Sequence, residues 1–214
     1  MLKCPGMFAP GHAELDVTNN EAVWRLLKLC RPRVVIHSAA LVGRAECQDN
    51  KEQAEQVNIC GTRNFMLACK EFKAKLVFIS TAAVFDGNQG NYVEDDKPNP
   101  QYFYAQTKLF AETIVRELED HLIIRTDFFD PTSFKYDQVY SDHYCSKEPT
   151  AIIAKKILAA IDAGATGVKH IGGPRRVLYE ILRPFFPSIR PIKIENSSMP
   201  DFPRDLSLAS KLTG

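Results

Sequence analysis

Long apolar runs, C-x-x-C cysteine pairs and an excess of charge of one sign are all missing from this chain of 214 residues. No apolar run approaches the ~18 residues that a membrane-spanning helix needs, and prolines and glycines interrupt the start of the chain where a signal peptide would be continuously apolar. With 27 Lys and Arg against 26 Asp and Glu, nothing favours nucleic acid or an anionic membrane as a partner. These absences predict a cytoplasmic protein.

Metal-binding patterns are missing as well. The 6 cysteines contain no C-x-x-C pair, and the 5 histidines are dispersed without the spacing of metal ligands. Most of the cysteines fall inside apolar helical patterns. They are therefore predicted to be reduced core thiols, and no metal site is expected.

What the chain does contain is an alternation of short apolar runs with helix-period segments, which predicts an α/β fold with a parallel sheet. Three Val- and Ile-rich runs at 33–38, 75–80 and 121–126 are typical of strands covered on both faces. Helices are expected between them, at about 53–73 and 102–118. An earlier helix is expected to open with a capping box formed by Thr18 and Glu21 and to stop at Pro32.

After Thr126 the pattern changes to a loop-like stretch that is rich in aromatic and polar residues. A further helix is expected at about 149–163, followed by a short strand and a Pro-rich tail. We interpret residues 1–126 as a Rossmann-like dinucleotide-binding domain with a doubly wound parallel sheet. Residues 127–214 are interpreted mostly as a small substrate-binding lobe.

Tyr104 and Lys108 are four residues apart, so both project from one helix face about one turn from each other. Thr81 follows the strand at 75–80, at the carboxyl edge of the sheet where doubly wound folds bind ligands. An ammonium beside a phenol lowers its pKa from about 10, which suits the phenol to protonate a carbonyl oxygen that a threonine hydroxyl holds. The alternative is a solvated helix pair and a strand-end cap.

Several ordered motifs resemble the extended short-chain dehydrogenase/reductase family. They are IST-x-x-VFDG, YVEDDKPNPQYFYAQTKLFAE and IIRT, together with LDVTN, VVIHSAA and VNICGTRN nearer the N-terminus. Within that family the chain is most similar to the dTDP-4-dehydrorhamnose reductase group of sugar-nucleotide reductases. The resemblance implies NADPH or NADH as cofactor and a nucleotide-linked sugar as substrate.

The same resemblance implies roles for individual residues. Thr81, Tyr104 and Lys108 match the catalytic triad. The matched cofactor-binding positions, which also include Tyr104 and Lys108, are Asp16, Val17, Ala39, Ala40, Leu41 and Asn58. The candidate substrate contacts, in addition to Thr81, are Phe128, Asp142, Tyr144, Ser146 and Arg204.

One element of this fold is missing. No G-x-G-x-x-G or G-x-x-G-x-x-G turn occurs, although such a turn should cradle the dinucleotide pyrophosphate at a helix N-terminus. The deficit is roughly one strand-helix-strand unit, on the order of 30 residues. Either Met1 is an internal start or fragment boundary, or the chain is a truncated product with an incomplete cofactor site.

Three functions follow as hypotheses. The first is NAD(P)H-dependent reduction of a nucleotide-linked 4-keto sugar. The second is epimerisation or dehydration of a sugar nucleotide, because the same trio on the same scaffold supports both reactions. The third is a non-catalytic binding or regulatory protein. A homodimer is also considered.

Overall fold

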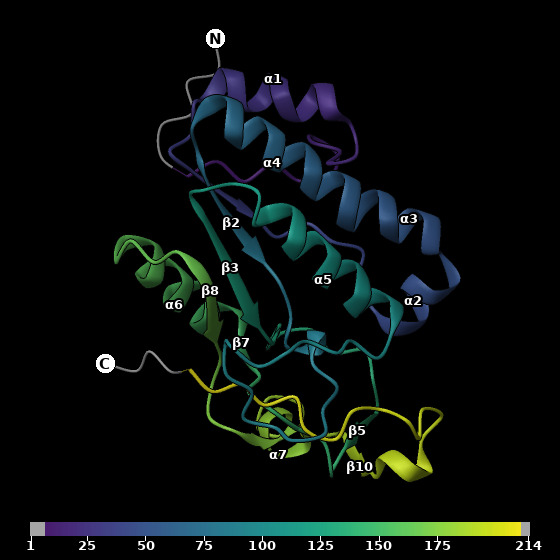
Figure 1. Ribbon diagram of the computed structural model, residues 1–214. Helices are drawn as coiled ribbons and strands as arrows, with labels where there is room; N and C mark the ends of the chain where they lie inside the picture. The colour runs from purple at the N-terminus through teal and green to yellow at the C-terminus, as the bar shows by residue number, and fades with distance from the viewer. Residues whose placement is uncertain (1–6, 211–214) are drawn as a thin grey trace. The chain divides into compact units, whose positions relative to one another are not determined.

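The computed structural model describes residues 7–210, and these residues form two compact units (Figure 1). The first unit ends at Ser80 and resumes over Tyr102–Ile123. The second unit consists of Thr81–Gln101 and the chain from Ile124 onward. The division of the sequence at residue 126 into two functional domains stays a prediction.

The first helix, α1, spans Asn20–Cys30, and its cap differs from the predicted one. Asn19 is the N-cap residue, and its side-chain oxygen accepts a hydrogen bond from the backbone N–H of Ala22 at 3.0 Å. The Thr18 hydroxyl instead donates to Asp16 at 2.8 Å. The predicted capping box is therefore wrong, because the helix begins one residue later and the Asn19 side chain provides the cap. Arg31, at φ 46°, ends the helix just before Pro32.

The three predicted strands form as β1 (Val34–His37), β2 (Lys75–Ile79) and β3 (His121–Thr126). β1 and β2 pair in parallel, with His37 opposite Phe78. β3 runs from the first unit into the second, where β8 (Gly167–Ile171) is the next strand in the sheet order β1-β2-β3-β8. All five residues of β2 are buried, whereas Ile36 on the edge strand β1 is 41% exposed.

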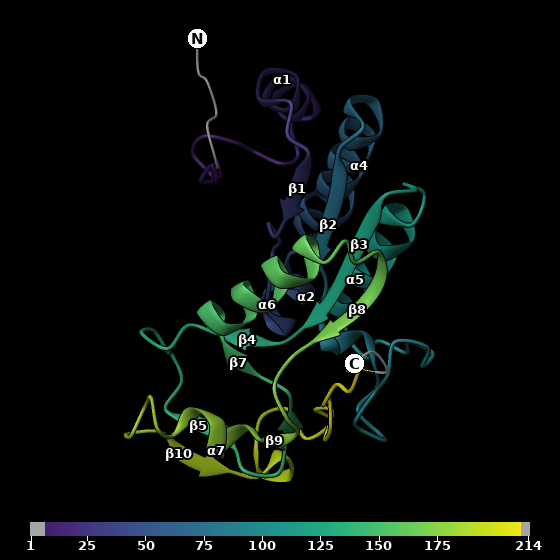
Figure 2. The same ribbon diagram turned by 90° about the vertical axis from the view of Figure 1, so that its left-hand side faces the viewer.

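The helix predicted at 53–73 is interrupted. The segment consists of α3 (Lys51–Glu55), one π-helical turn over Gln56–Cys60, and α4 (Gly61–Phe72), and α2 (Arg44–Asp49) precedes it. The predicted helix at 102–118 forms as α5 (Phe103–Val115). α4 and α5 lie side by side and both pack against β2 (Figures 1 and 2).

The stretch predicted as loop-like after Thr126 contains short strands in the second unit, so that prediction is incomplete. Each strand has two or three residues and pairs with a segment more distant in sequence, which explains why no period is visible. The pairs are β4 (Phe128–Phe129) with β7 (Glu148–Pro149), β5 (Gln138–Tyr140) with β10 (Arg190–Ile192), and β6 (Tyr144–Cys145) with β9 (Arg176–Val177). Figure 2 shows β5 and β10 next to α7 (Leu178–Leu182).

Three further helical segments lie in the second unit. α6 spans Thr150–Asp162, close to the helix predicted at 149–163, and two 3-10 turns lie at Ala82–Val84 and Ile194–Asn196. An apolar core joins the short strands to α7. Its buried members are Phe129, Val139, Cys145, Ile181, Leu182 and Ile189.

The cysteines depart from prediction at one position. Cys47, Cys60, Cys69 and Cys145 are free thiols, as expected. Cys30 is disulfide-bonded, which corrects the prediction that all six thiols are reduced. Cys4 lies outside the described residues.

Candidate active site

The candidate site in the first unit is the face of α5 that carries Tyr104 and Lys108. Lys108 is 2% exposed, and its Nζ lies 4.0 Å from the centre of the Phe78 ring on β2. The ring face attracts the cation, and the four-residue spacing puts Tyr104 on the same helix face. The structure therefore excludes the alternative of a solvated helix pair for Lys108.

Burial sets the charge of the groups around Lys108. Desolvation lowers the pKa of Lys108 to about 7, although the negative charge of Glu112 opposes this shift. His37 on β1 is also buried, and desolvation followed by repulsion from Lys108 lowers its pKa to about 3. His37 is thus neutral near pH 7, and Glu112 carries the negative charge acting on Lys108.

Asn58 joins α5 to the loop that follows β1. Its amide oxygen accepts from the backbone N–H of Leu41 at 2.8 Å, and its amide nitrogen donates to the Leu41 carbonyl at 3.0 Å. The same nitrogen donates to the Thr107 hydroxyl at 3.0 Å, which in turn donates to the Tyr104 carbonyl at 2.7 Å. One buried amide therefore fixes the loop against the helix turn between Tyr104 and Lys108.

The π-helical turn that holds Asn58 also fixes the orientation of His37. The Thr62 hydroxyl donates to the Asn58 carbonyl at 2.7 Å, so its oxygen is left to accept from His37 Nε2 at 3.1 Å. This assigns the proton of the neutral imidazole to Nε2. Turns of this type are frequent at functional sites.

Thr81 belongs to the second unit, whereas Tyr104 and Lys108 belong to the first. The Thr81 Oγ1 accepts a hydrogen bond from the backbone N–H of Ala83 at 3.1 Å and caps the 3-10 turn after β2. A cap uses the lone pairs of a hydroxyl and leaves its proton available to a carbonyl oxygen. The convergence of the three residues stays a prediction.

The first unit contains the residues predicted to contact the adenosine of the cofactor. It also contains the turn of small residues that is predicted to line the cofactor. Asp16 is exposed, and hydrogen bonds from the backbone and side chain of Thr18 lower its pKa. The Val17 carbonyl accepts from Asn64 at 3.0 Å, which holds this segment on α4. Ala39 and Ala40 precede Leu41 in the loop after β1. Their contacts with a cofactor stay predictions.

The residues predicted to contact substrate lie in the second unit. Phe128 is 43% exposed, and the Arg175 guanidinium stacks on the Tyr144 ring at 3.7 Å. Asp142 and Arg204 pair with each other at 3.7 Å. Ser146 is fully buried, and its hydroxyl bonds both backbone groups of Leu208. The structure therefore gives Ser146 a structural role, and its contact with a sugar stays a prediction.

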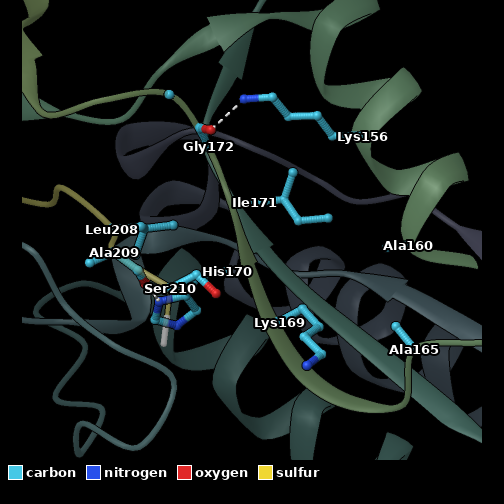
Figure 3. A pocket seen from close by; sticks show the side chains of 11 residues that line it. Lys156, Ala160, Ala165, Lys169, His170, Ile171, Gly172, Leu208, Ala209 and Ser210 are labelled. Carbon is cyan, nitrogen blue, oxygen red and sulfur yellow. Dashed lines mark hydrogen bonds between the residues drawn. The ribbon is translucent and has the colours of Figure 1, made fainter. Parts of the chain in front are cut away.

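A cavity of about 610 Å³ lies between α6 and β8 in the second unit, and none of the predicted site residues lines it. Lys156 reaches across from α6 and donates to the Gly172 carbonyl at 2.6 Å (Figure 3). Lys169 and Ile171 extend from β8 on the side facing α6.

Sequence reasoning missed two side chains of the site. Glu112 is fully buried and accepts from the Ser80 hydroxyl at 2.6 Å. Its position four residues after Lys108 is a pattern that could have identified it. Thr107 could not be identified in this way, because its partner Asn58 is 49 residues away.

Over residues 7–210, no cluster of three metal-ligating side chains occurs. The same residues contain no helix long and apolar enough to cross a membrane.

Comparison with protein families finds one match, over residues 4–132, to the model described as the RmlD substrate binding domain. Among curated proteins, methionine adenosyltransferase 2 subunit beta of Rattus norvegicus is 27% identical over 162 residues, which cover 67% of this chain and 48% of that protein. The dTDP-4-keto-6-deoxy-D-glucose reductase of Streptomyces niveus is 28% identical over 174 residues, covering 73% and 60%. The chain thus spans about half the length of the first of these relatives.

Among solved structures, a dTDP-4-dehydrorhamnose reductase from Bacillus anthracis, in complex with NADP, superimposes with a TM-score of 0.86. The two sequences are 23% identical, and the match covers 95% of this chain and 81% of that one. This likeness concerns the fold, and it confirms the predicted Rossmann-like α/β architecture.

Proposed function

Because the chain belongs to the RmlD substrate-binding domain family, we propose that it serves in the NAD(P)H-dependent reduction of a nucleotide-linked 4-keto sugar. The predicted resemblance to sugar-nucleotide reductases is confirmed at the level of the family. The reaction and the substrate are the proposal. The cytoplasmic location and the homodimer stay predictions.

The observation that carries the proposal is the burial of Lys108 one helical turn from Tyr104. Lys108 is 2% exposed, so its ammonium loses its hydration, and this desolvation costs free energy of folding. An ammonium favours the phenolate form of a neighbouring tyrosine, and a nearby cation therefore moves the pKa of a phenol toward neutral pH. Tyr104 would then protonate the carbonyl oxygen of the sugar, and Thr81 would orient that oxygen.

The residues of the first unit fit the nicotinamide end of a dinucleotide. Lys108 would hold the ribose, and the loop from Ala39 to Leu41, fixed by Asn58, would line the cofactor. When bound, the nicotinamide supplies the hydride. The sequence has no Gly-rich turn for the pyrophosphate, so the fit extends to one end of the cofactor.

The names of relatives support the substrate class. One relative is named dTDP-4-keto-6-deoxy-D-glucose reductase and another dTDP-4-dehydrorhamnose reductase, at 28% and 29% identity. Both names describe reduction of a keto group on a dTDP-linked sugar. We transfer the class of substrate, a nucleotide-linked keto sugar, and not the individual sugar.

The decisive test is Tyr104→Phe in the full-length protein, with oxidation of NADPH and NADH followed in the presence of a dTDP-4-keto sugar. Loss of one general acid is expected to lower kcat by about 10²- to 10⁴-fold while the affinity for the cofactor is unchanged. Tyr136→Phe, at a residue that is 58% exposed in the second unit, is the matched control. Full activity of Tyr104→Phe would contradict the proposal. Catalytic rather than stoichiometric use of the cofactor would indicate an epimerase or dehydratase.

One relative favours a second candidate function. It is named as a subunit of methionine adenosyltransferase 2, which suggests that a chain of this family can serve as a partner of another enzyme. In that role Tyr104→Phe would leave the effect on the partner enzyme intact. For both candidate functions, titration of the protein with NADPH measures cofactor binding independently of turnover.

A further inference from the structure

The α5 face that carries Tyr104 and Lys108 continues one turn further, to Glu112. Residues at i, i+4 and i+8 lie along one side of a helix, so these three side chains form a row. Glu112 is 0% exposed and Lys108 2% exposed, whereas Tyr104 is half-buried, so Glu112 is the most deeply buried of the three. A carboxylate in such a place costs free energy unless it is hydrogen-bonded or paired.

Two contacts of Glu112 are well defined. Its Oε1 accepts the Ser80 hydroxyl at 2.6 Å, a short distance typical of a bond to an ionised acceptor. Its Oε2 lies 3.6 Å from the guanidinium of Arg116, whose side chain is 47% exposed. Ser80 follows the last residue of β2 and directly precedes Thr81. The carboxylate therefore ties α5 to the point where β2 leads into Thr81.

The surroundings of Lys108 leave few sources of negative charge. Phe78 from β2 presents its ring face, and His37 from β1 is neutral near pH 7. On α5 itself, Glu112 acts on Lys108 in the direction that favours the ammonium. Arg116 faces Glu112 from the next turn and weakens this attraction only from a partly solvated position.

We propose that Glu112 is a positioning residue for the Tyr104–Lys108 pair, because its buried carboxylate fixes the end of β2 through Ser80 and provides the counter-charge for the Lys108 ammonium. This inference rests on the proposed function. It predicts that these two roles of Glu112 are separable. Fixing the end of β2 needs the hydrogen bond to Ser80, whereas stabilising the Lys108 ammonium needs the negative charge.

Glu112→Gln removes the charge and keeps an oxygen that accepts from Ser80. Glu112→Asp keeps the charge and shortens the side chain, which breaks that hydrogen bond. Ser80→Ala removes the donor, and Glu117→Gln removes an exposed carboxylate beyond the end of the same helix as the matched control.

The first measurement needs no turnover. In the 214-residue chain with ¹³Cε-labelled lysine, the Lys108 signal is assigned with Lys108→Met and titrated by NMR. Glu112→Gln is expected to lower the Lys108 pKa by about one unit or more, whereas Glu112→Asp and Glu117→Gln leave it close to the wild-type value. An unchanged Lys108 pKa in Glu112→Gln would overturn the proposal even if the protein is an active reductase. If Glu112→Gln does not fold, a Lys108 pKa in Glu112→Asp far from the wild-type value overturns it instead.

The second measurement follows turnover. Because the active form needs a charged Lys108, Glu112→Gln is expected to move the alkaline limb of the kcat profile to lower pH. Ser80→Ala is expected to lower kcat by about tenfold without moving that limb, because it misplaces Thr81 and leaves the charge. A purely structural role for Glu112 would give equal losses at every pH. A wild-type enzyme without activity would count against the proposed function, and the NMR titration would still decide the role of Glu112.

Discussion

Lys108, buried in the first unit, and Lys147, half-buried in the second, have pKa shifts of opposite sign. Burial against the Phe78 ring lowers the pKa of Lys108 to about 7, and the charge of Glu112 one helical turn away offsets only part of this shift. Burial also acts to lower the pKa of Lys147, but the ion pair with Asp127 outweighs it and raises that pKa. A carboxylate in direct contact thus decides whether a buried ammonium is stabilised.

The two environments also differ in how cations are used. In the second unit Lys147, Arg175 and Arg176 each pair with a carboxylate from another segment of the chain, namely Asp127, Asp205 and Glu148. These pairs join short strands that have few backbone hydrogen bonds of their own. In the first unit Lys108 is kept close to its titration point, which is where proton chemistry near pH 7 needs it. The contrast predicts a structural role for Lys147 and a functional role for Lys108.

Replacing each lysine with methionine is the most direct test of the different roles of Lys108 and Lys147. Lys108→Met is expected to lower kcat by at least about 10²-fold without destabilising the protein at pH 7, because the variant removes an ammonium whose burial costs free energy. Lys147→Met is expected to destabilise the protein by about 1–3 kcal/mol, because Asp127 loses its counter-charge in a partly buried place. Enzyme assays and urea unfolding measure both. A stable, fully active Lys147→Met together with an unfolded Lys108→Met would reverse the assignment.

The pH dependence of the free energy of unfolding also distinguishes Lys108 from Lys147. The native pKa of Lys108, about 7, lies below its unfolded value of 10.5, so the unfolded chain binds more protons between these limits. Lys108 therefore destabilises the fold below about pH 7, and this effect disappears as the pH rises toward 10.5. Lys147, with a raised pKa, stabilises at neutral pH and loses that contribution in strong alkali. Unfolding curves of wild type and Lys108→Met should converge as the pH rises from 7 to 10.

His37 is expected to have a corresponding effect on stability at acid pH. Its pKa falls from 6.5 to about 3 on folding, so its buried neutral form costs stability as the pH drops from 6.5 toward 3. His37→Gln is expected to reduce the loss of stability on acidification. A loss of the same size in wild type and variant would show that other groups drive acid unfolding.

The smallest expected effect concerns neutral hydrogen-bonded groups. Asn58→Ala removes bonds to Leu41 and Thr107 and is expected to destabilise by about 2 kcal/mol. Ser146→Ala removes two bonds to Leu208 in the second unit and should cost about 1 kcal/mol. Equal losses would mean that Asn58 is no more than a core amide. A selective loss of cofactor affinity in Asn58→Ala would support its predicted place beside the cofactor.

Sequence reasoning was accurate where structure is local. The strands at 75–79 and 121–126 and the helices α5 and α6 lie within a few residues of their predicted bounds. It was less accurate at the cap of α1, where Asn19 rather than Thr18 accepts the hydrogen bond, because the helix begins one residue later than predicted. The short strands of the second unit were missed because two or three residues are too few to show a period.

By itself the sequence determined the family and the spacing of Tyr104 and Lys108, since helix geometry follows from neighbours within four residues. Only the tertiary structure decided the electrostatics. Ser80 and Glu112 are 32 residues apart and Asn58 and Thr107 are 49 apart, yet each pair is hydrogen-bonded. The pKa of Lys108 depends on β1, β2 and α5 excluding water from one place. Desolvation is a property of packing, and no local pattern encodes it.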